Sequence, residues 1–179
     1  MPEWWKKNSK NVPLHHENFQ KIVSFFVYEC PVQRKNGNKV TPRATTFEDR
    51  GIVDGKQVSL LNVLKQKIEH KECFQCCETD SDIINIEKAI HKKYPVENHT
   101  EFVLYIENKD LRKTRTVYYS IRNALAHGTF SYVEAKNGEI YYYLEAKKED
   151  KIKARICIKE KTILKWVDIT QRMMKTGYV

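Results

Sequence analysis

The sequence predicts a mainly α-helical domain that carries a small three-stranded antiparallel β-meander and a C-terminal helix. Apolar residues recur at helical spacing in several stretches before residue 128, the period changes to two between about residues 130 and 158, and helical spacing then returns. The 179 residues include only six glycines and five prolines, which favours long elements over an all-β sandwich.

A chain of this length can bury one sizeable hydrophobic core. We therefore expect a single domain over residues 1–179, in which residues 14–128 form a helical bundle. Residues 130–179 would add a hairpin, a third strand and a last helix to that bundle.

The first expected helix starts near Pro13 and ends before Pro31, because proline suits a first helical turn and stops a helix. The segment 33–57 is rich in turn dipeptides and is expected to be a long loop, with a short element around Thr46–Ile52.

A second helix is expected from a cap at Ser59 towards Cys77, and a third from a cap at Asp80 or Ser81 to about Tyr94. The apolar residues after Glu101, ending at Ile106, suit either a helical turn or a buried segment.

The fourth helix, which begins at about Lys109 and ends at Gly128, is predicted to have two faces. Its core-facing arc comprises Thr114, Val117, Tyr118, Ile121, Ala124 and Leu125. The opposite arc comprises Arg112, Arg115, Tyr119, Arg122, Asn123 and Ala126, with His127 at its shoulder. A tyrosine and an alanine among three arginines suggest a surface that meets a partner.

After Gly128 the alternation predicts a hairpin with strands around Tyr132–Glu134 and Ile140–Leu144, joined by a turn at Asn137-Gly138. A third strand places one set of apolar residues on a single face: Ile152, Ala154, Ile156 and Ile158. The last helix has these residues at helical spacing: Ile163, Trp166, Val167, Thr170, Met173 and Met174.

The excess of 32 Lys and Arg over 23 Asp and Glu gives a formal net charge of +9, which favours an anionic partner such as nucleic acid. No apolar run approaches the roughly 18 residues of a membrane span, and the N-terminus lacks the apolar core of a signal peptide. We therefore expect a cytoplasmic protein without a membrane partner, whose five cysteines are reduced thiols.

Cofactor sites find little support. His70, Cys73 and Cys77 would share one face of the second helix if that helix continued, but a structural zinc site needs four ligands, and the rest would have to come from His91 or Cys30. We favour buried or idle cysteines, and expect no metal and no cofactor. The chain has no phosphate-binding glycine loop and no common hydrolase motif.

The remaining candidate is Arg122-Asn123-Ala124-Leu125-Ala126-His127-Gly128. An arginine followed by a histidine with four to six residues between them is common by chance, so the spacing alone proves nothing. Asn directly after the arginine, at the end of an amphipathic helix, is more specific. From the residues alone, two readings stay open: a catalytic set, or a histidine near helix carbonyls with a solvated arginine.

This RNALAHG segment, late in a small basic helical domain, resembles the signature of the HEPN superfamily, whose members carry R-x4-6-H at the end of a bundle helix. The resemblance implies a HEPN-like helical bundle and a metal-independent endoribonuclease that leaves a 2′,3′-cyclic phosphate. It implies that His127 is a general acid or base, that Arg122 stabilises the phosphorane, and that Asn123 orients the histidine or a phosphate.

Such proteins act as homodimers with the two motifs facing each other, which implies a dimer through the Arg115–His127 helix face. RNA would be held by Arg115, Tyr119 and Arg112. The resemblance further implies a role in toxin or defence systems, with an antitoxin or regulator protein as a possible partner. The alternative is a non-catalytic HEPN-like module that binds RNA, a nucleotide or a protein.

Overall fold

The computed structural model describes residues 16–29, 32–34, 40–42, 50–53, 56–94 and 99–176. At its centre lies a five-stranded mixed sheet with the strand order β5-β6-β9-β8-β7. The strands β5 and β6 are parallel, and every other neighbouring pair is antiparallel. The strands are β5 (Phe74–Cys77), β6 (Phe102–Ile106), β7 (Phe130–Glu134), β8 (Ile140–Lys148) and β9 (Lys151–Lys159).

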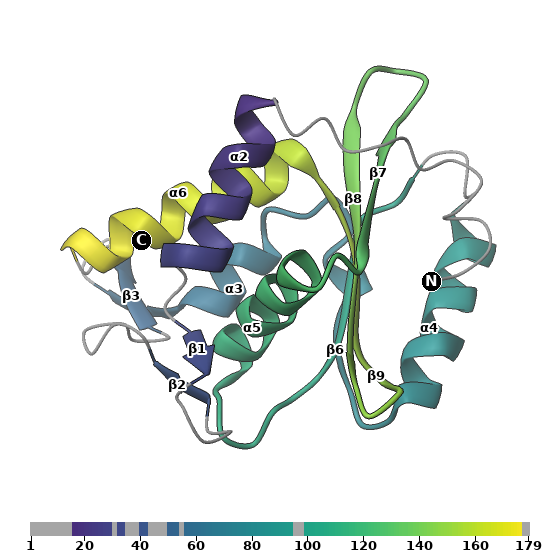
Figure 1. Cartoon of the computed structure of the whole chain (residues 1–179), viewed down its shortest axis with the longest axis horizontal. Coiled ribbons are helices and arrows are strands. Elements are labelled where there is room, and N and C mark those ends of the chain that lie inside the picture. The colour runs from purple at the N-terminus through teal and green to yellow at the C-terminus, as the bar shows by residue number, and fades with distance from the viewer. Residues whose placement is uncertain are drawn as a thin grey trace.

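Helices cover both faces of this sheet (Figure 1). One face packs on α2, α3, α5 and α6 through a core that includes Phe19, Leu64, Val117 and Trp166, while α4 covers the other face with Ile83 and Ile90. The helices are α2 (Glu17–Val23), the π-helix η1 (Ser24–Glu29), α3 (Leu60–Lys65), the 3-10 turn η2 (Lys71–Cys73), α4 (Asp80–Lys93), α5 (Lys113–Ala126) and α6 (Glu160–Thr176).

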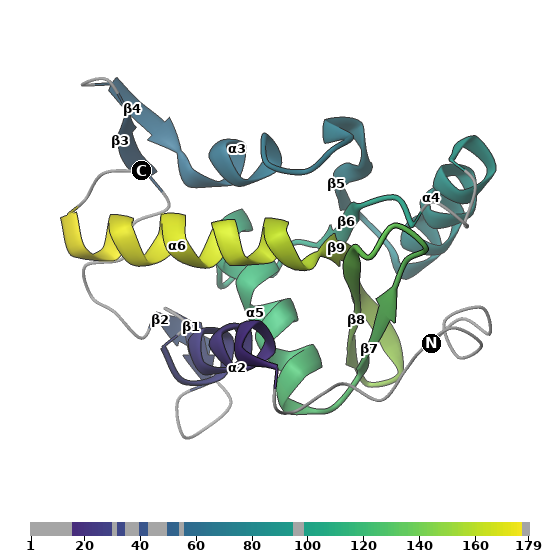
Figure 2. The same ribbon diagram turned by 90° about the horizontal axis from the view of Figure 1, so that it is seen from above.

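The helix α6 runs between α3 on one side and α2 with α5 on the other (Figure 2). Trp166 is fully buried, and its Nε1 donates a hydrogen bond to the Leu64 carbonyl of α3 at 3.1 Å. The Tyr118 hydroxyl of α5 makes a hydrogen bond with Thr170 of α6. These contacts fix α5 between α6 and the sheet.

The predicted mainly α-helical bundle with a small β-meander is therefore wrong, because the fold is a mixed sheet between two helical layers. The meander was expected correctly as β7, β8 and β9, but β9 also pairs with β6, which pairs with β5. The segment Phe102–Tyr105 is buried on both faces of the sheet, so it shows no alternation from which a strand could be recognised.

The second helix is shorter than predicted. It ends at Lys65, and the residues towards Cys77 form η2 and the edge strand β5 instead. His70, Cys73 and Cys77 therefore share no helical face. The third helix is capped by Thr79, one residue earlier than predicted, whose side chain accepts from the Asp82 N–H at 3.1 Å in a capping box.

The core-facing arc predicted for the fourth helix is confirmed in α5, because all six of its residues are buried. The helix begins at Lys113 rather than Lys109. Gly128 adopts φ +66° and ends the helix as predicted. The Gly128 and Thr129 N–H groups donate to the Leu125 and Ala124 carbonyls, which is a Schellman motif.

The β7–β8 hairpin, β9 and α6 follow the sequence prediction, and the first helix is found as α2 with η1. Where a long loop was expected over 33–57, the described parts of 32–59 form two small antiparallel pairs, β1 (Val32–Arg34) with β2 (Val40–Pro42) and β3 (Arg50–Val53) with β4 (Lys56–Ser59). Pro13, Pro31 and the rest of that loop lie outside the described residues. No described helix has the length and apolar character needed to cross a bilayer.

Candidate functional site

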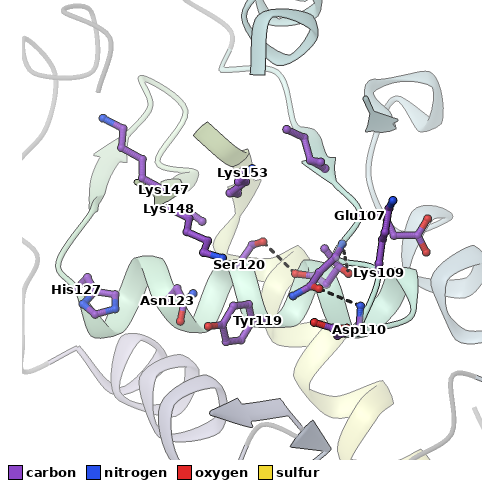
Figure 3. A pocket seen from close by; sticks show the side chains of 14 residues that line it. Glu107, Lys109, Asp110, Tyr119, Ser120, Asn123, His127, Lys147, Lys148 and Lys153 are labelled. Carbon is purple, nitrogen blue, oxygen red and sulfur yellow. Dashed lines mark hydrogen bonds between the residues drawn. The ribbon is translucent and has the colours of Figure 1, made fainter. Parts of the chain in front are cut away.

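A cavity of about 540 Å³ lies beside the outer face of α5 (Figure 3). Three segments form it: the outer side of α5, the end of the β8–β9 hairpin, and the turn between β6 and α5. The lining residues are Ile106, Glu107, Asn108, Lys109, Asp110, Thr116, Tyr119, Ser120, Asn123, His127, Ala146, Lys147, Lys148 and Lys153.

A β-bulge shapes the wall opposite α5. Ala146 pairs with Ala154, but the next residue, Lys147, pairs with Ile152, so Lys153 has no partner in the register. An unpaired bulge residue shifts the alternation of its strand by one position. Lys153 therefore lines the cavity, and Ile152 belongs to the core beside α4. The predicted common face of Ile152 and Ala154 is wrong for this reason.

The two lysines at the end of β8 point in different directions. Figure 3 shows the Lys148 side chain directed towards α5 above Asn123, whereas the Lys147 side chain extends away from the cavity. The Lys147 Nζ lies 3.0 Å from Glu145 Oε1. The ammonium group that faces the helix is therefore that of Lys148. Its Nζ lies 4.0 Å from Oε1 of Glu149, whose side chain is strongly exposed.

A buried ion-pair network lies behind this wall, on the α4 side of the sheet. Arg155 Nε donates to Glu145 Oε2 at 2.9 Å, and Arg155 Nη1 donates to Glu87. Burial alone would raise the pKa of Glu145, but the hydrogen bonds from Lys147 and Arg155 outweigh it and lower that pKa. The Glu145 carboxylate therefore binds both Lys147 and Arg155 at the base of the β8–β9 hairpin.

The cavity floor is the stripe of α5 that holds Tyr119, Asn123 and His127. Each residue is one helical turn from the next, so their side chains lie on one side of the helix. His127 is exposed and occupies the C-cap position, which the Schellman turn at Gly128 sets. Tyr119 is half-buried and also packs against the main core.

The predicted arginines stand outside the cavity. Arg112, Arg115 and Arg122 are absent from its lining, while Asn123 and Tyr119 from the same predicted arc belong to it. Arg122 is nevertheless linked to the site, because its Nη1 donates to Asn123 Oδ1 at 3.2 Å. Asn123 Oδ1 thus accepts its hydrogen bond from Arg122 rather than from the ring of His127. The Nδ2 group of Asn123 can therefore donate to a ligand in the cavity.

Sequence reasoning missed the acidic residues of the cavity, Glu107 and Asp110, and its lysines, which are Lys109, Lys147, Lys148 and Lys153. The segment 147–153 carries four lysines in seven positions, which was a usable signal for an anion-binding wall. Which of these lysines face α5 depends on the bulge, and strand alternation alone gives the wrong answer there.

The zinc alternative has no support among the described residues, where no group of three or more His, Cys, Asp or Glu side chains could hold a metal ion. Burial raises the pKa of Cys73 to about 11 and that of Cys77 to about 11, which disfavours the thiolates that zinc requires. Cys30 lies outside the described residues.

Comparisons with known proteins add no relative, since no protein-family description, no curated protein and no solved structure matches the chain. The chemistry must therefore be judged from the cavity itself. The cavity has the size of a small-ligand site, and it is lined by an exposed imidazole, an amide donor and an ammonium group. Such a set can hold a phosphate and transfer a proton beside it.

Proposed function

We propose that the protein is a metal-independent endoribonuclease of the cytosol that cleaves RNA by attack of a ribose 2′-hydroxyl on the adjacent phosphate. The observation that carries this proposal is that His127, Asn123 and Lys148 line the same cavity. Imidazole is the side chain best suited to proton transfer near neutral pH. A lysine ammonium and an amide N–H are suitable donors to phosphate oxygens.

In this reaction the O2′–P bond forms and the P–O5′ bond breaks, which leaves a 2′,3′-cyclic phosphate and a free 5′-hydroxyl. One proton leaves the 2′-hydroxyl and one is gained by the 5′-oxygen. His127 performs one of these transfers as general base or general acid. Lys148 and the Asn123 amide stabilise the charge that develops on the phosphorane oxygens, and Arg122 positions Asn123 through its 3.2 Å hydrogen bond.

The resemblance of RNALAHG to the HEPN signature supports the same chemistry, although it rests on the motif and not on the predicted bundle. It also suggests action as a toxin or defence effector that a regulator protein restrains. A toxin of this kind is expected to slow growth when expressed, and His127→Ala is expected to relieve that effect.

We further propose a homodimer through the exposed side of α5. Arg122 lies outside the cavity of its own chain and is roughly 140° from His127 around an ideal helix. A two-fold pairing of the Arg115–His127 face would bring Arg122 of each subunit towards His127 of the other. Ala126 is exposed in the middle of this face and leaves space for a second helix.

The direct test is cleavage of single-stranded RNA in EDTA by the native protein and by His127→Ala, Lys148→Ala and Lys88→Ala. Lys88 is the matched control, because it is an exposed lysine on α4 across the sheet. His127→Ala is expected to lose about 10²–10⁴-fold in rate. Lys148→Ala should lose activity, Lys88→Ala should keep it, and the product should end in a 2′,3′-cyclic phosphate.

Cleavage that survives His127→Ala would refute the chemistry. RNA binding with no cleavage in the native protein would instead favour the non-catalytic binding module. The dimer is tested by mixing the His127→Ala and Arg122→Ala proteins. A site that needs Arg122 from the second subunit regains activity on mixing, because one subunit then supplies His127 and the other Arg122. A site in which Arg122 acts only on Asn123 of its own chain does not.

A further inference from the structure

The end of the cavity opposite His127 carries a carboxylate that the proposed function leaves without a role. Asp110 lies in the turn before α5 and lines the cavity together with Glu107. Figure 3 shows the Asp110 carboxylate directed towards Tyr119, while the Glu107 carboxylate points away. Within the described residues, the Asp110 carboxylate makes no hydrogen bond or ion pair of its own.

The backbone around Asp110 is firmly held. Its N–H donates to Asn108 Oδ1 at 3.0 Å, and the Leu111 N–H donates to the Asn108 carbonyl at 2.9 Å. The Asn108 N–H in turn donates to Thr116 Oγ1 of α5 at 3.2 Å, and Leu111 is buried in the main core. This turn therefore fixes an unpaired acceptor at a set place relative to α5.

The order of residues along α5 matches the order of groups in one nucleotide. Asn123 lies under Lys148, and Tyr119 and His127 each lie one turn away, at roughly 6 Å of helix rise. A phosphate at Asn123 and Lys148 would place the attached nucleoside over Tyr119. Its aromatic ring is the kind of platform on which unpaired bases stack. The cavity volume of about 540 Å³ suits one nucleotide rather than a duplex.

We infer that this cavity selects guanosine as the nucleoside on the 5′ side of the cleaved bond, through the Asp110 carboxylate. The inference rests on the proposed function, because it takes the scissile phosphate to lie at Asn123 and Lys148. An ionised carboxylate has two acceptor oxygens and no donor. Guanine alone among the four bases presents two adjacent donors, N1–H and the N2 amino group, on its Watson–Crick edge.

The other bases fit such a carboxylate poorly. Adenine and cytosine present one amino group beside an unprotonated ring nitrogen, whose lone pair faces the second carboxylate oxygen. Uracil presents a single N3–H between two carbonyl oxygens. A polar group left against a like group loses its hydration without a replacement bond. Guanine is therefore favoured over each of them by on the order of ten- to a hundredfold.

The test measures binding without cleavage. Native protein is titrated with four dinucleotides that share a 3′ adenosine and carry guanine, adenine, cytosine or uracil on a first sugar lacking its 2′-hydroxyl, so no attack can occur. Dissociation constants are measured calorimetrically. The same titrations use Asp110→Asn, and Glu107→Gln as the matched control, since both residues are exposed carboxylates on the same rim.

We expect tenfold or tighter binding of the guanine dinucleotide to the native protein and to Glu107→Gln, with the preference lost in Asp110→Asn. Equal binding of all four, or a guanine preference that survives Asp110→Asn, overturns the inference. Guanine-selective binding without cleavage of intact RNA would reject the ribonuclease and leave only guanine recognition by the Asp110 carboxylate. Cleavage after all four bases alike would support the ribonuclease and reject the selection of guanosine.

Discussion

Arg155 is the position where the fold's electrostatics can be tested most sharply. Its side chain is 12% exposed, and its guanidinium stands between Glu87 and Glu145, whose side chains are 5% and 3% exposed. Arg155→Met keeps much of the side-chain volume but leaves both carboxylates buried without this cation. Breaking a buried pair in this way costs about 3–5 kcal/mol in the free energy of unfolding.

The loss should be measured by urea unfolding followed by circular dichroism. With a slope of about 2 kcal/mol per molar urea, it lowers the midpoint by roughly 1.5–2.5 M. Part of the charge on Glu145 remains compensated, because Lys147 Nζ lies 3.0 Å from it. We therefore expect the triple variant Glu87→Gln, Glu145→Gln, Arg155→Met to recover much of the loss, since it removes the stranded charges with their partner.

The pH dependence follows from the lowered pKa of Glu145. Its ordinary value is 4.5 and its folded value is lower, so its stabilising contribution is present above pH 4.5. That contribution disappears as the pH falls through the folded pKa. The difference between native protein and Arg155→Met should be largest above about pH 5 and smaller below 4.5. A loss below about 1 kcal/mol at pH 7 would refute a network of this strength.

Two further predictions concern Gly128 and the cysteines. Gly128→Ala places a Cβ in open space but at φ +66°, so it should lower the free energy of unfolding, measured by thermal unfolding, by about 1–2 kcal/mol. Gly138→Ala, at φ +78°, should lower it as much. Only Gly128→Ala should also reduce RNA cleavage, because it shifts His127. Equal effects on cleavage would argue against a site at the end of α5. Cys76 is exposed, whereas Cys73, Cys77 and Cys157 are buried, and burial raises the pKa of each buried thiol. Alkylation at pH 8, mapped by mass spectrometry, should therefore label Cys76 much faster than those three; rapid labelling of Cys157 would contradict the packing of β9 against α4.

Much of the chain from Lys113 onward was predictable because its signals are local. The core arc of α5, its stop at Gly128, the hairpin turn at Asn137-Gly138 and the apolar stripe of α6 each follow from neighbours in sequence. The motif residues Asn123 and His127 were predicted to be neighbours on the helix, and both line one cavity.

The partners of Asn123 and His127 were not predictable in the same way. Arg122 was expected at the reacting phosphate, but in this chain it holds the Asn123 amide from outside the cavity. Lys148 and Asp110 come from a hairpin and a turn that hydrophobic periodicity does not place. Their distance from His127 depends on how β8 and the β6–α5 turn pack against the helix.

Local signals in the sequence predicted which segments after residue 113 form helices and hairpin strands, and which side of α5 is buried, because period and turn chemistry act over a few residues. The ends of the strands and the pairing of the central sheet depend on contacts between distant segments. The pairing of β6 with β9 joins segments about fifty residues apart, and both faces of β6 are buried, so no alternation marks it. The bulge at Lys153 exists only as a register between two strands. Long-range hydrogen bonding between strands therefore places Lys148 and Lys153 on the same side as His127, and the cavity forms between the hairpin and the end of α5.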